Sequence, residues 1–297
     1  MKTKETTEIF EENRSRLMRI AYRMLGSLDE AEDIVQDAWV RWQAVDLDVV
    51  REPAAYLTRT VTRLCLDTIK SARSRREVYF GNWLPEPVVP EEEFYPRDEL
   101  TLTLMLALER LSPLERAAFL LHDVFDTPLE EIAITLKRDP AAVRQLAVRA
   151  RKHVQAAHPR YPVAPEEGER IAEAFFTASQ KGDIEGLQTL LAENVTLHSD
   201  GGGKVKAFPN PIVGLERIVR LYGGLSRKLG GPYQTMIQSI RVDGLPGYAS
   251  LEFGVLQTTA FEIEEGRITG IYVTRNPDKL SRIAQILEPE ETPMPSE

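Results

Sequence analysis

The sequence predicts a multidomain protein in which two all-α domains are followed by an α+β domain. Its 297 residues are too many for one ordinary hydrophobic core, and 42% of them are hydrophobic, which is enough to fill more than one. Apolar residues recur at helical spacing over residues 6–158, whereas residues 195–275 contain alternating, strand-like stretches. Helices followed by consecutive strands favour an α+β domain with a curved antiparallel sheet packed on helices.

Composition and charge exclude several classes of function. The 37 Lys and Arg residues against 46 Asp and Glu residues give a net charge of -9, which argues against indiscriminate binding to DNA or acidic membranes. A locally basic face can still bind DNA. Cys65 is the single cysteine, and the four histidines lack metal-ligand spacing, so we expect no disulfide, metal or cofactor. The charged N-terminus and the lack of a long apolar run predict a cytoplasmic protein without a membrane span.

The first all-α domain is expected over residues 6–76, and its second helix, DEAEDIVQDAWVRW, has two contrasting faces. Ser27 can cap this helix, with Glu30 three residues later. One face is apolar at helical spacing: Ala31, Ile34, Val35, Ala38, Trp39 and Trp42. The other face is polar: Glu32, Asp33, Gln36, Asp37 and Arg41. From periodicity alone, a solvated face on a core helix is the simplest interpretation of this polar surface.

The third helix of this domain is basic. It is expected to begin at Pro53, a residue suited to the first turn, and its side chains include Tyr56, Arg59 and Arg63. An acidic helix beside a basic one could bind a basic partner on one face and an acidic partner on the other. The alternative is that these arginines only contribute to solubility.

Residues 77–97 form a predicted linker rich in Pro and Glu. It contains the stretch WLPEPV at residues 83–88, and large apolar groups such as Trp83 and Leu84 are unusual in a plain spacer. They could dock on another part of the protein or collapse locally on a neighbouring helix.

The second all-α domain is expected over residues 98–158, followed by a linker over residues 159–166. A short helix, the turn KRDP and a longer basic helix form a helix-turn-helix pattern. Its lysines and arginines suit phosphates, and the residues near the start of the long helix could reach base edges in a major groove. A basic helical hairpin that does not bind DNA is the alternative. The candidate DNA-binding residues are Arg138, Arg144, Gln145, Arg149, Arg151 and Lys152.

The predicted α+β domain covers residues 167–287, and the acidic tail of residues 288–297 should be disordered. His198 and Asp200 lie two apart in a strand-like stretch, so they could form an acid–base pair in a pocket or merely support the following loop. That loop, DGGGK at residues 200–204, could bind an anion or act as a flexible turn.

Taken together, residues 6–158 resemble a bacterial RNA polymerase sigma factor of the extracytoplasmic-function (ECF) type. The resemblance rests on LMRIAYRMLGSLDEAEDIVQDAWVRW, PAAYLTRTVTRLCLDTIKSARSRR, LSPLERAAFLLHDVF and AVRQLAVRARKHV in this order. It implies that residues 6–76 are sigma region 2 and residues 98–158 are sigma region 4. It also implies that core RNA polymerase and promoter DNA are the partners, through the clamp of the largest subunit and the flap of the second largest.

The resemblance assigns roles to individual residues. Asp33, Gln36, Asp37 and Arg41 match the helix that docks on polymerase. Tyr56, Arg59 and Arg63 match the helix that faces the melted promoter element, and residues 43–52 match the loop that accepts a flipped base. Arg144, Gln145 and Arg149 match the recognition helix, in which Val148 stands where such helices often carry a polar residue. No catalytic residue is implied, because the chemistry belongs to the polymerase.

The C-terminal part resembles the cone-shaped SnoaL-like domain fused to one subgroup of these factors. Three motifs carry the resemblance: Trp83, Leu84, Pro85, Glu86, Pro87 and Val88; Asp200, Gly201, Gly202, Gly203 and Lys204; and Asn276, Pro277, Asp278, Lys279 and Leu280. This resemblance implies that the extension replaces a separate anti-sigma factor. We therefore expect it to contact the linker through Trp83 and to hold the two DNA-binding domains in a compact arrangement.

Two alternatives remain open. A helix-turn-helix repressor would bind promoters tightly without polymerase, although the acidic helix of residues 29–42 argues against it. A SnoaL-like small-molecule enzyme or ligand sensor fused to a DNA-binding module would turn over or bind a small molecule.

Overall fold

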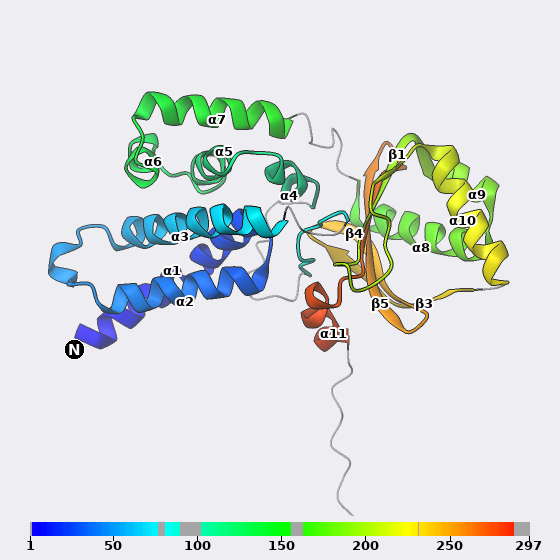
Figure 1. Cartoon of the computed structure of the whole chain (residues 1–297), viewed down its shortest axis with the longest axis horizontal. Helices are drawn as coiled ribbons and strands as arrows, with labels where there is room; N and C mark the ends of the chain where they lie inside the picture. The colour runs from blue at the N-terminus through cyan, green and yellow to red at the C-terminus, as the bar shows by residue number, and fades with distance from the viewer. Residues whose placement is uncertain (1, 77–80, 90–101, 156–162, 231, 288–297) are drawn as a thin grey trace, which may run out of the picture. The chain divides into compact units, whose positions relative to one another are not determined.

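The computed structural model describes residues 2–76, 81–89, 102–155, 163–230 and 232–287. The chain divides into two compact units, one formed by residues 1–78 and 91–158 and the other by residues 79–90 and 159–297 (Figure 1). Residues 81–89 therefore belong with the C-terminal unit, although in sequence they lie between the two all-α regions. The predicted disordered tail of residues 288–297 falls outside the described ranges. So do residues 159–162 of the predicted linker 159–166, and residues 77–80 and 90–97 of the predicted linker 77–97.

The first unit is helical throughout its described part. Its first three helices correspond to the predicted region 2, and the others to region 4. They are α1 (Lys2–Leu25), α2 (Leu28–Gln43), the 3-10 turn η1 (Leu47–Val49), α3 (Pro53–Arg76), α4 (Leu102–Glu109), α5 (Pro113–Phe119), the π-helical turn η2 (Leu120–Val124), α6 (Leu129–Leu136) and α7 (Pro140–Gln155). Within these ranges no helix is both long and apolar enough to cross a membrane.

The apolar face of α2 supplies the core of the first three helices. Trp42 is fully buried, and its indole Nε1 donates a hydrogen bond to the backbone oxygen of Thr6, 2.9 Å away. Trp39 is only half-buried and packs its ring against Phe10, with 4.9 Å between the ring centroids. Ser27 caps the helix as predicted, accepting a hydrogen bond from the Glu30 amide. The predicted division of α2 into an apolar and a polar face is confirmed.

The predicted helix-turn-helix is formed by α6 and α7. Lys137 ends α6 in the left-handed conformation, with φ 53°, and Asp139 accepts a hydrogen bond from the Ala142 amide at the start of α7. Before these helices, Ser112 and Glu115 form a reciprocal capping box at the start of α5. The inner face of α7 is buried as predicted, through Val143, Ala147, Ala150 and Val154.

The second unit is an α+β domain with a six-stranded sheet. The strand order is β2-β1-β6-β5-β4-β3. The prediction of an antiparallel sheet holds for every pairing except that of β1 with β6, which is parallel. A parallel pair needs a long crossover, and the chain between these two strands contains one helix, α10, and the four strands β2 to β5. The elements are α8 (Pro165–Lys181), α9 (Ile184–Leu190), β1 (Leu191–Asp200), β2 (Ile212–Val213), α10 (Leu215–Leu229), β3 (Gln234–Val242), β4 (Leu245–Glu252), β5 (Val255–Glu264), β6 (Arg267–Thr274), the 3-10 turn η3 (Pro277–Lys279) and α11 (Ser281–Leu287).

Tight turns connect the last four strands. Each consists of two residues with positive φ, as a type I′ turn requires, and the second residue is always glycine. The turn at Phe253 and Gly254, with φ 52° and 79°, divides the strand-like stretch of residues 249–265 into β4 and β5. The other turns are at Asp243-Gly244 and Glu265-Gly266.

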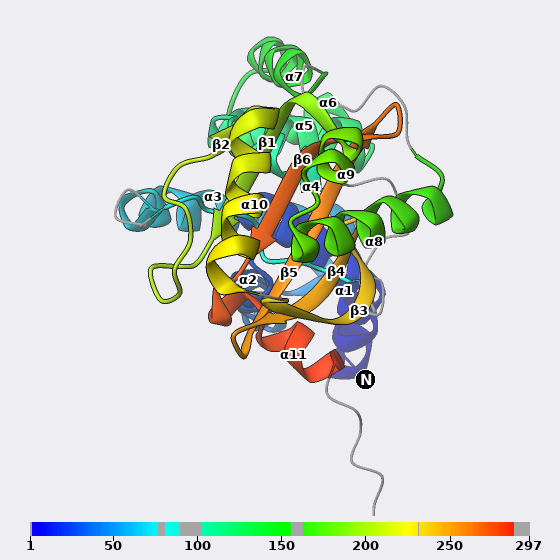
Figure 2. The same ribbon diagram turned by 90° about the vertical axis from the view of Figure 1, so that its right-hand side faces the viewer.

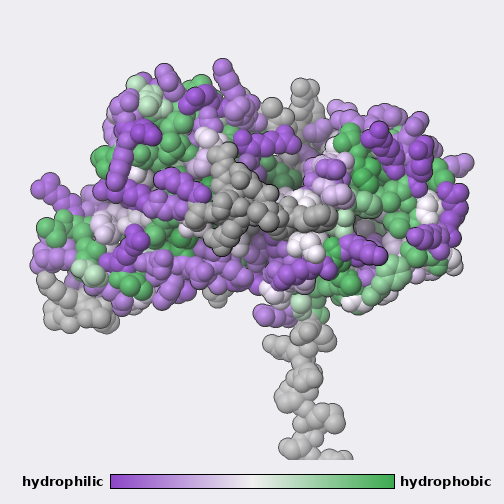
Figure 3. Space-filling model, viewed as in Figure 1, coloured by the Kyte–Doolittle hydropathy of each residue, from purple (hydrophilic) through white to green (hydrophobic). Residues whose placement is uncertain are grey.

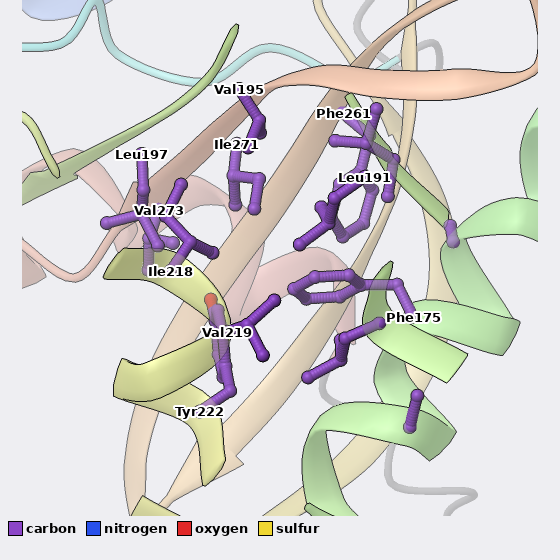
Figure 4. Packing of buried hydrophobic residues seen from close by; sticks show 14 of the residues in the cluster. Phe175, Leu191, Val195, Leu197, Ile218, Val219, Tyr222, Phe261, Ile271 and Val273 are labelled. Atoms are coloured by element: carbon purple, nitrogen blue, oxygen red, sulfur yellow. The ribbon is translucent and has the colours of Figure 1, made fainter. Parts of the chain in front are cut away.

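The three helices α8, α9 and α10 pack against one face of the sheet (Figure 2). Phe175 of α8 lies at the centre of this core, with its ring 4.9 Å from that of Phe261 and 5.1 Å from that of Tyr222. Ile218 and Val219 of α10 face Leu197 and Val273 of the sheet in the same layer (Figure 4). The opposite side of the domain carries α11 and the segment of residues 81–89, whose Val89 packs with Leu280 and Ile283.

Candidate binding surfaces and the linker site

The predicted polymerase-docking residues form one exposed polar surface on α2. Asp33, Gln36, Asp37 and Arg41 all lie on the solvent side of this helix, opposite the buried Ala38 and Trp42. The face of the first unit seen in Figure 3 carries hydrophilic residues over both α2 and α7. A surface of this kind is free to meet a partner without rearranging the helix core.

The predicted promoter-melting residues of α3 are more buried than the α2 surface, and one of them is hydrogen-bonded to α6. Tyr56 is half-buried, with its ring 5.7 Å from that of Trp42. Arg63 donates hydrogen bonds to the backbone oxygens of Ile134 and Thr135, at 2.9 and 3.0 Å, and so binds the C-terminal end of α6. The free carbonyls at a helix C-terminus favour a cation, so this contact stabilises the packing of α3 on the helix-turn-helix. Arg59 is also half-buried on α3.

The predicted base-accepting loop of residues 43–52 contains η1. Asp46 caps this short turn by accepting a hydrogen bond from the Asp48 amide. Val49 at its end is 76% exposed, an unusual position for a branched apolar side chain.

The predicted DNA-binding residues of the helix-turn-helix divide into two groups. Arg149 forms an ion pair with Glu115 at 3.3 Å, and Arg151 forms one with Asp123 at 2.6 Å, so these two arginines also hold α7 against the preceding helices. Burial acts to raise the pKa of Glu115, but the hydrogen bonds from Ser112 and the charge of Arg149 outweigh it and hold that pKa below its usual value. The remaining residues are exposed: Arg138, Arg144, Gln145 and Lys152, with Val148 beside them at 42% exposure.

The linker motif lies in a site built by the C-terminal unit. The amide of Leu84 donates to Asp200 Oδ2 at 2.9 Å, and Lys279 Nζ donates to the Leu84 backbone oxygen. Lys279 Nζ also bonds Asp200 Oδ2 at 2.8 Å and lies 4.4 Å from the centre of the Trp83 ring, in a cation–π contact. Asp200 is fully buried, so its charge is held by these partners and by the Gly202 amide.

The following linker residues are held in the same way. Asp243 Oδ2 accepts a hydrogen bond from the Val88 amide at 3.4 Å, and its own amide donates to the Val88 oxygen at 2.8 Å. Glu86 is 3% exposed and lies 3.8 Å from Arg282, while Pro85 and Pro87 are buried beside it. We call Asp200, Asp243, Lys279 and Arg282 the linker site. The sequence motifs contain Asp200 and Lys279 but not Asp243 or Arg282, which sequence reasoning missed.

The motifs at residues 200–204 and 276–280 hold the linker site in place through contacts with each other. Gly202 has φ 62°, and a Cβ there would lie 2.5 Å from the side chain of Asn276, so only glycine fits. A Cβ on Gly201 would lie 2.1 Å from the Val205 backbone oxygen. Lys204 pairs with Asp278 at 2.6 Å, and this joins the end of one motif to the other. The loop is therefore a rigid turn that presents Asp200 to the linker.

An acid–base pair of His198 and Asp200 inside the domain's cavity is not supported. Leu197 and Ser199 line the cavity, so the alternate residues of β1 point to the opposite face of the sheet. There the His198 ring stacks on Tyr272, with centroids 5.4 Å apart, and Asp200 binds the linker. The described part of the chain also contains no group of three or more His, Cys, Asp or Glu side chains that could hold a metal ion.

The two helical regions have the architecture of sigma-70 proteins. The family model for Sigma-70 region 2 matches residues 9–75, and the model for Sigma-70, region 4 matches residues 101–154. These matches correspond to α1–α3 and α4–α7.

Whole-length relatives define the family. The ECF RNA polymerase sigma factor SigJ of Mycobacterium tuberculosis (strain ATCC 25618 / H37Rv) is 36% identical over 288 residues, which cover 92% of each chain. The probable ECF RNA polymerase sigma factor SigI of the same strain is 31% identical over 276 residues, 90% of this chain and 92% of the relative. The crystal structure of the M. tuberculosis SigJ aligns with a TM-score of 0.73 at 32% identity, over 93% of this chain and 98% of that one. The chain therefore belongs to the ECF RNA polymerase sigma factors, and to the subgroup with a SnoaL-like C-terminal extension.

Proposed function

We propose that the SnoaL-like domain controls this sigma factor by binding the linker between regions 2 and 4. The observation that carries the proposal is the pair of hydrogen bonds that Asp200 and Lys279 form with the backbone of Leu84. Both bonds are to backbone atoms, and the first is buried and the second partly buried. They therefore fix the path of the linker, and with it the distance by which the two regions can separate.

Contacts between regions 2 and 4 support the proposal. Arg63 matches a promoter-melting position but is bound to the end of α6. The buried Arg116 of region 4 donates to the backbone oxygen of Met24 in region 2, at 2.8 Å. A form of the protein in which Arg63 contacts DNA must break these contacts between regions 2 and 4. Core polymerase shifts the population toward this open form if it binds the open form several kcal/mol more tightly than the form in which the two regions are packed together.

In the active complex, each exposed surface has one proposed partner. The α2 surface binds the clamp of the largest subunit of core RNA polymerase, and region 4 binds the flap of the second largest. Region 2 and the helix-turn-helix bind promoter DNA, the former through Tyr56, Arg59 and Arg63. No separate anti-sigma factor is needed if the C-terminal domain restrains the linker, and no residue of the chain acts as a catalyst. The protein acts in the cytoplasm, where the polymerase works.

Run-off transcription with purified core polymerase tests the control by the C-terminal domain. We expect truncation after His158 and the variant Trp83→Ala to change promoter transcription severalfold, because both weaken the hold on the linker. An increase identifies the domain as an inhibitor, and a decrease identifies it as an activator. Phe253→Ala is the matched control, since this aromatic side chain is 68% exposed and is not one of the residues that form the linker site. Unchanged transcription and unchanged domain spacing in both altered proteins would contradict the proposal.

Charge reversal on α2 tests the docking surface. We expect Asp33→Lys or Asp37→Lys to weaken binding to core polymerase at least about 100-fold, because a like charge at an interface costs several kcal/mol. Both side chains are exposed, so the helical circular dichroism signal should stay unchanged. Glu185→Lys on the exposed side of α9 is the control for net charge. Equal polymerase affinity in all the variants would return this face of α2 to a merely solvated role.

A further inference from the structure

The SnoaL-like domain contains a cavity of about 190 Å³ between α10 and the sheet. Its walls are largely apolar and come from Leu197, Val273, Leu221, Leu225 and Tyr222 (Figure 4 shows the first two facing α10). An apolar cavity of about 150 Å³ is already large enough to hold benzene, so this one can hold a small organic molecule.

The cavity lining carries two buried amide oxygens that have no hydrogen-bond partner within the described ranges of the chain. Gln257 is 1% exposed, and its Oε1 has no hydrogen-bond partner among the residues that the structure describes, although its Nε2 donates to Ser250 Oγ at 3.3 Å. Gln234 also lines the cavity, and its Oε1 likewise has no hydrogen-bond partner among the described residues. Buried polar groups are nearly always satisfied, so unpartnered amide groups that line a cavity indicate a bound polar group.

The charges in the lining favour a neutral ligand. Arg275 pairs with Glu252 at 3.2 Å, and both side chains are mostly buried, at 15% and 17% exposure. Their charges therefore cancel within the cavity, and Lys206 lies exposed at its rim. An amide can present either its oxygen or its nitrogen, and a hydroxyl, which both donates and accepts, satisfies either.

The cavity is connected to the linker through its own lining. The Arg275 amide donates to the backbone oxygen of Asp200 at 2.7 Å, so it is bonded to the residue that holds Leu84. Phe208 of the lining accepts a hydrogen bond from Asn82 of the linker at 3.3 Å. A molecule in contact with Arg275 and Phe208 therefore touches residues that bind the linker on both sides of Trp83.

We propose that this cavity binds a small, neutral, largely apolar molecule with one hydroxyl group, and that the bound molecule strengthens the hold on the linker. The cavity is present in the form in which the linker is bound, and a ligand that fits one state shifts the population toward it. The binding site stands on the cavity alone, whereas the regulatory consequence rests on the proposed control through the linker.

Equilibrium dialysis of the full-length protein tests the site, with 2-naphthol as the probe and naphthalene as the matched probe without a hydroxyl. We expect 2-naphthol to bind about tenfold more tightly than naphthalene, as one hydrogen bond to a buried unpaired group would give. Gln257→Leu should abolish this difference, and Leu221→Trp, which fills the cavity, should abolish the binding of both probes. Gln188→Leu, an exposed glutamine on α9, should change neither. Absence of 2-naphthol binding, or a hydroxyl preference that survives Gln257→Leu, would overturn the site.

Hydrogen exchange of the Leu84 amide tests the connection to the linker. We expect saturating 2-naphthol to slow this exchange severalfold, and Lys279→Ala to weaken 2-naphthol binding, because coupling between two sites is reciprocal. Binding of 2-naphthol with unchanged exchange would overturn the coupling while leaving the site intact. Neither the dialysis nor the hydrogen-exchange measurement uses polymerase. A failure of ligand binding or of its coupling to the linker can therefore be distinguished from a failure of the proposed control of transcription.

Discussion

Lys279→Ala is expected to release the linker, so that the amide of Leu84 exchanges with solvent on the order of 100-fold faster. The buried carboxylate of Asp200 would lose its ion pair with the Lys279 ammonium, and the Leu84 oxygen would lose the hydrogen bond that this ammonium donates. Removal of one partner of a buried ion pair costs about 3–5 kcal/mol, because the other charge stays buried. Hydrogen exchange with mass spectrometry over residues 81–89 measures the effect directly.

Lys204→Ala is the matched control for this prediction. Its ion pair with Asp278 is as short, at 2.6 Å, but both side chains are exposed, at 55% and 63%. Exposed pairs contribute about 1 kcal/mol or less, so exchange at Leu84 should change by less than about fivefold. If Leu84 stayed equally protected in Lys279→Ala, the backbone contacts of the linker would not depend on this lysine.

Local patterns predicted the helices because the forces that form them are local. Ser27 caps α2 through a hydrogen bond to the residue three positions later. The apolar spacing of this helix can also be read from residues 28–43 alone, without knowing which helices pack against it. The strands were harder to divide. Residues 249–265 alternate without a break, and Phe253 is an unusual first residue for a type I′ turn, so only the following Gly254 indicated the turn.

The linker site could be predicted only in part, because its contacts join distant parts of the sequence. Trp83 and Leu84 indicated that the linker docks, but local collapse was an equal alternative. The bonds that decide the position of Leu84 reach residues 116 and 195 positions later. The role of Asp243 could not be predicted for another reason. An Asp-Gly pair indicates a hairpin turn, and the Asp243 carboxylate accepts the hydrogen bond from the Val88 amide only once the domain has folded.

Arg63 shows the same limit within the first unit. Its position in the basic helix indicates a phosphate or base contact, and the resemblance to sigma factors assigns it to the melted promoter. In the structure, Arg63 instead donates hydrogen bonds to the backbone oxygens of Ile134 and Thr135. Helix ends and phosphates both offer negatively polarised oxygens, so sequence alone does not tell which one an arginine binds in a given state.

Arg116→Ala is expected to destabilise the packing of region 4 on region 2 by about 3 kcal/mol. The Arg116 side chain is almost fully buried, and its guanidinium donates to the Leu108 oxygen at 2.9 Å, to the Met24 oxygen at 2.8 Å and to Glu109 at 2.6 Å. Arg116→Lys should restore little of the loss, since a single ammonium cannot reproduce the planar fork that serves these acceptors. Urea unfolding followed by Trp39 and Trp42 fluorescence, in a Trp83→Phe background, measures the change.

Arg110→Ala is the matched control, because this neighbouring arginine is exposed and should change the urea midpoint by less than the equivalent of about 0.5 kcal/mol. A midpoint for Arg116→Ala that equals the control would mean that the buried guanidinium does not hold the two regions together. The two variants also separate the contributions to compaction. Arg116→Ala should leave the Leu84 amide protected, whereas Lys279→Ala should expose it without moving the Trp42 transition. If both variants activate transcription, the linker site and the Arg116 contact restrain the same opening from two independent places.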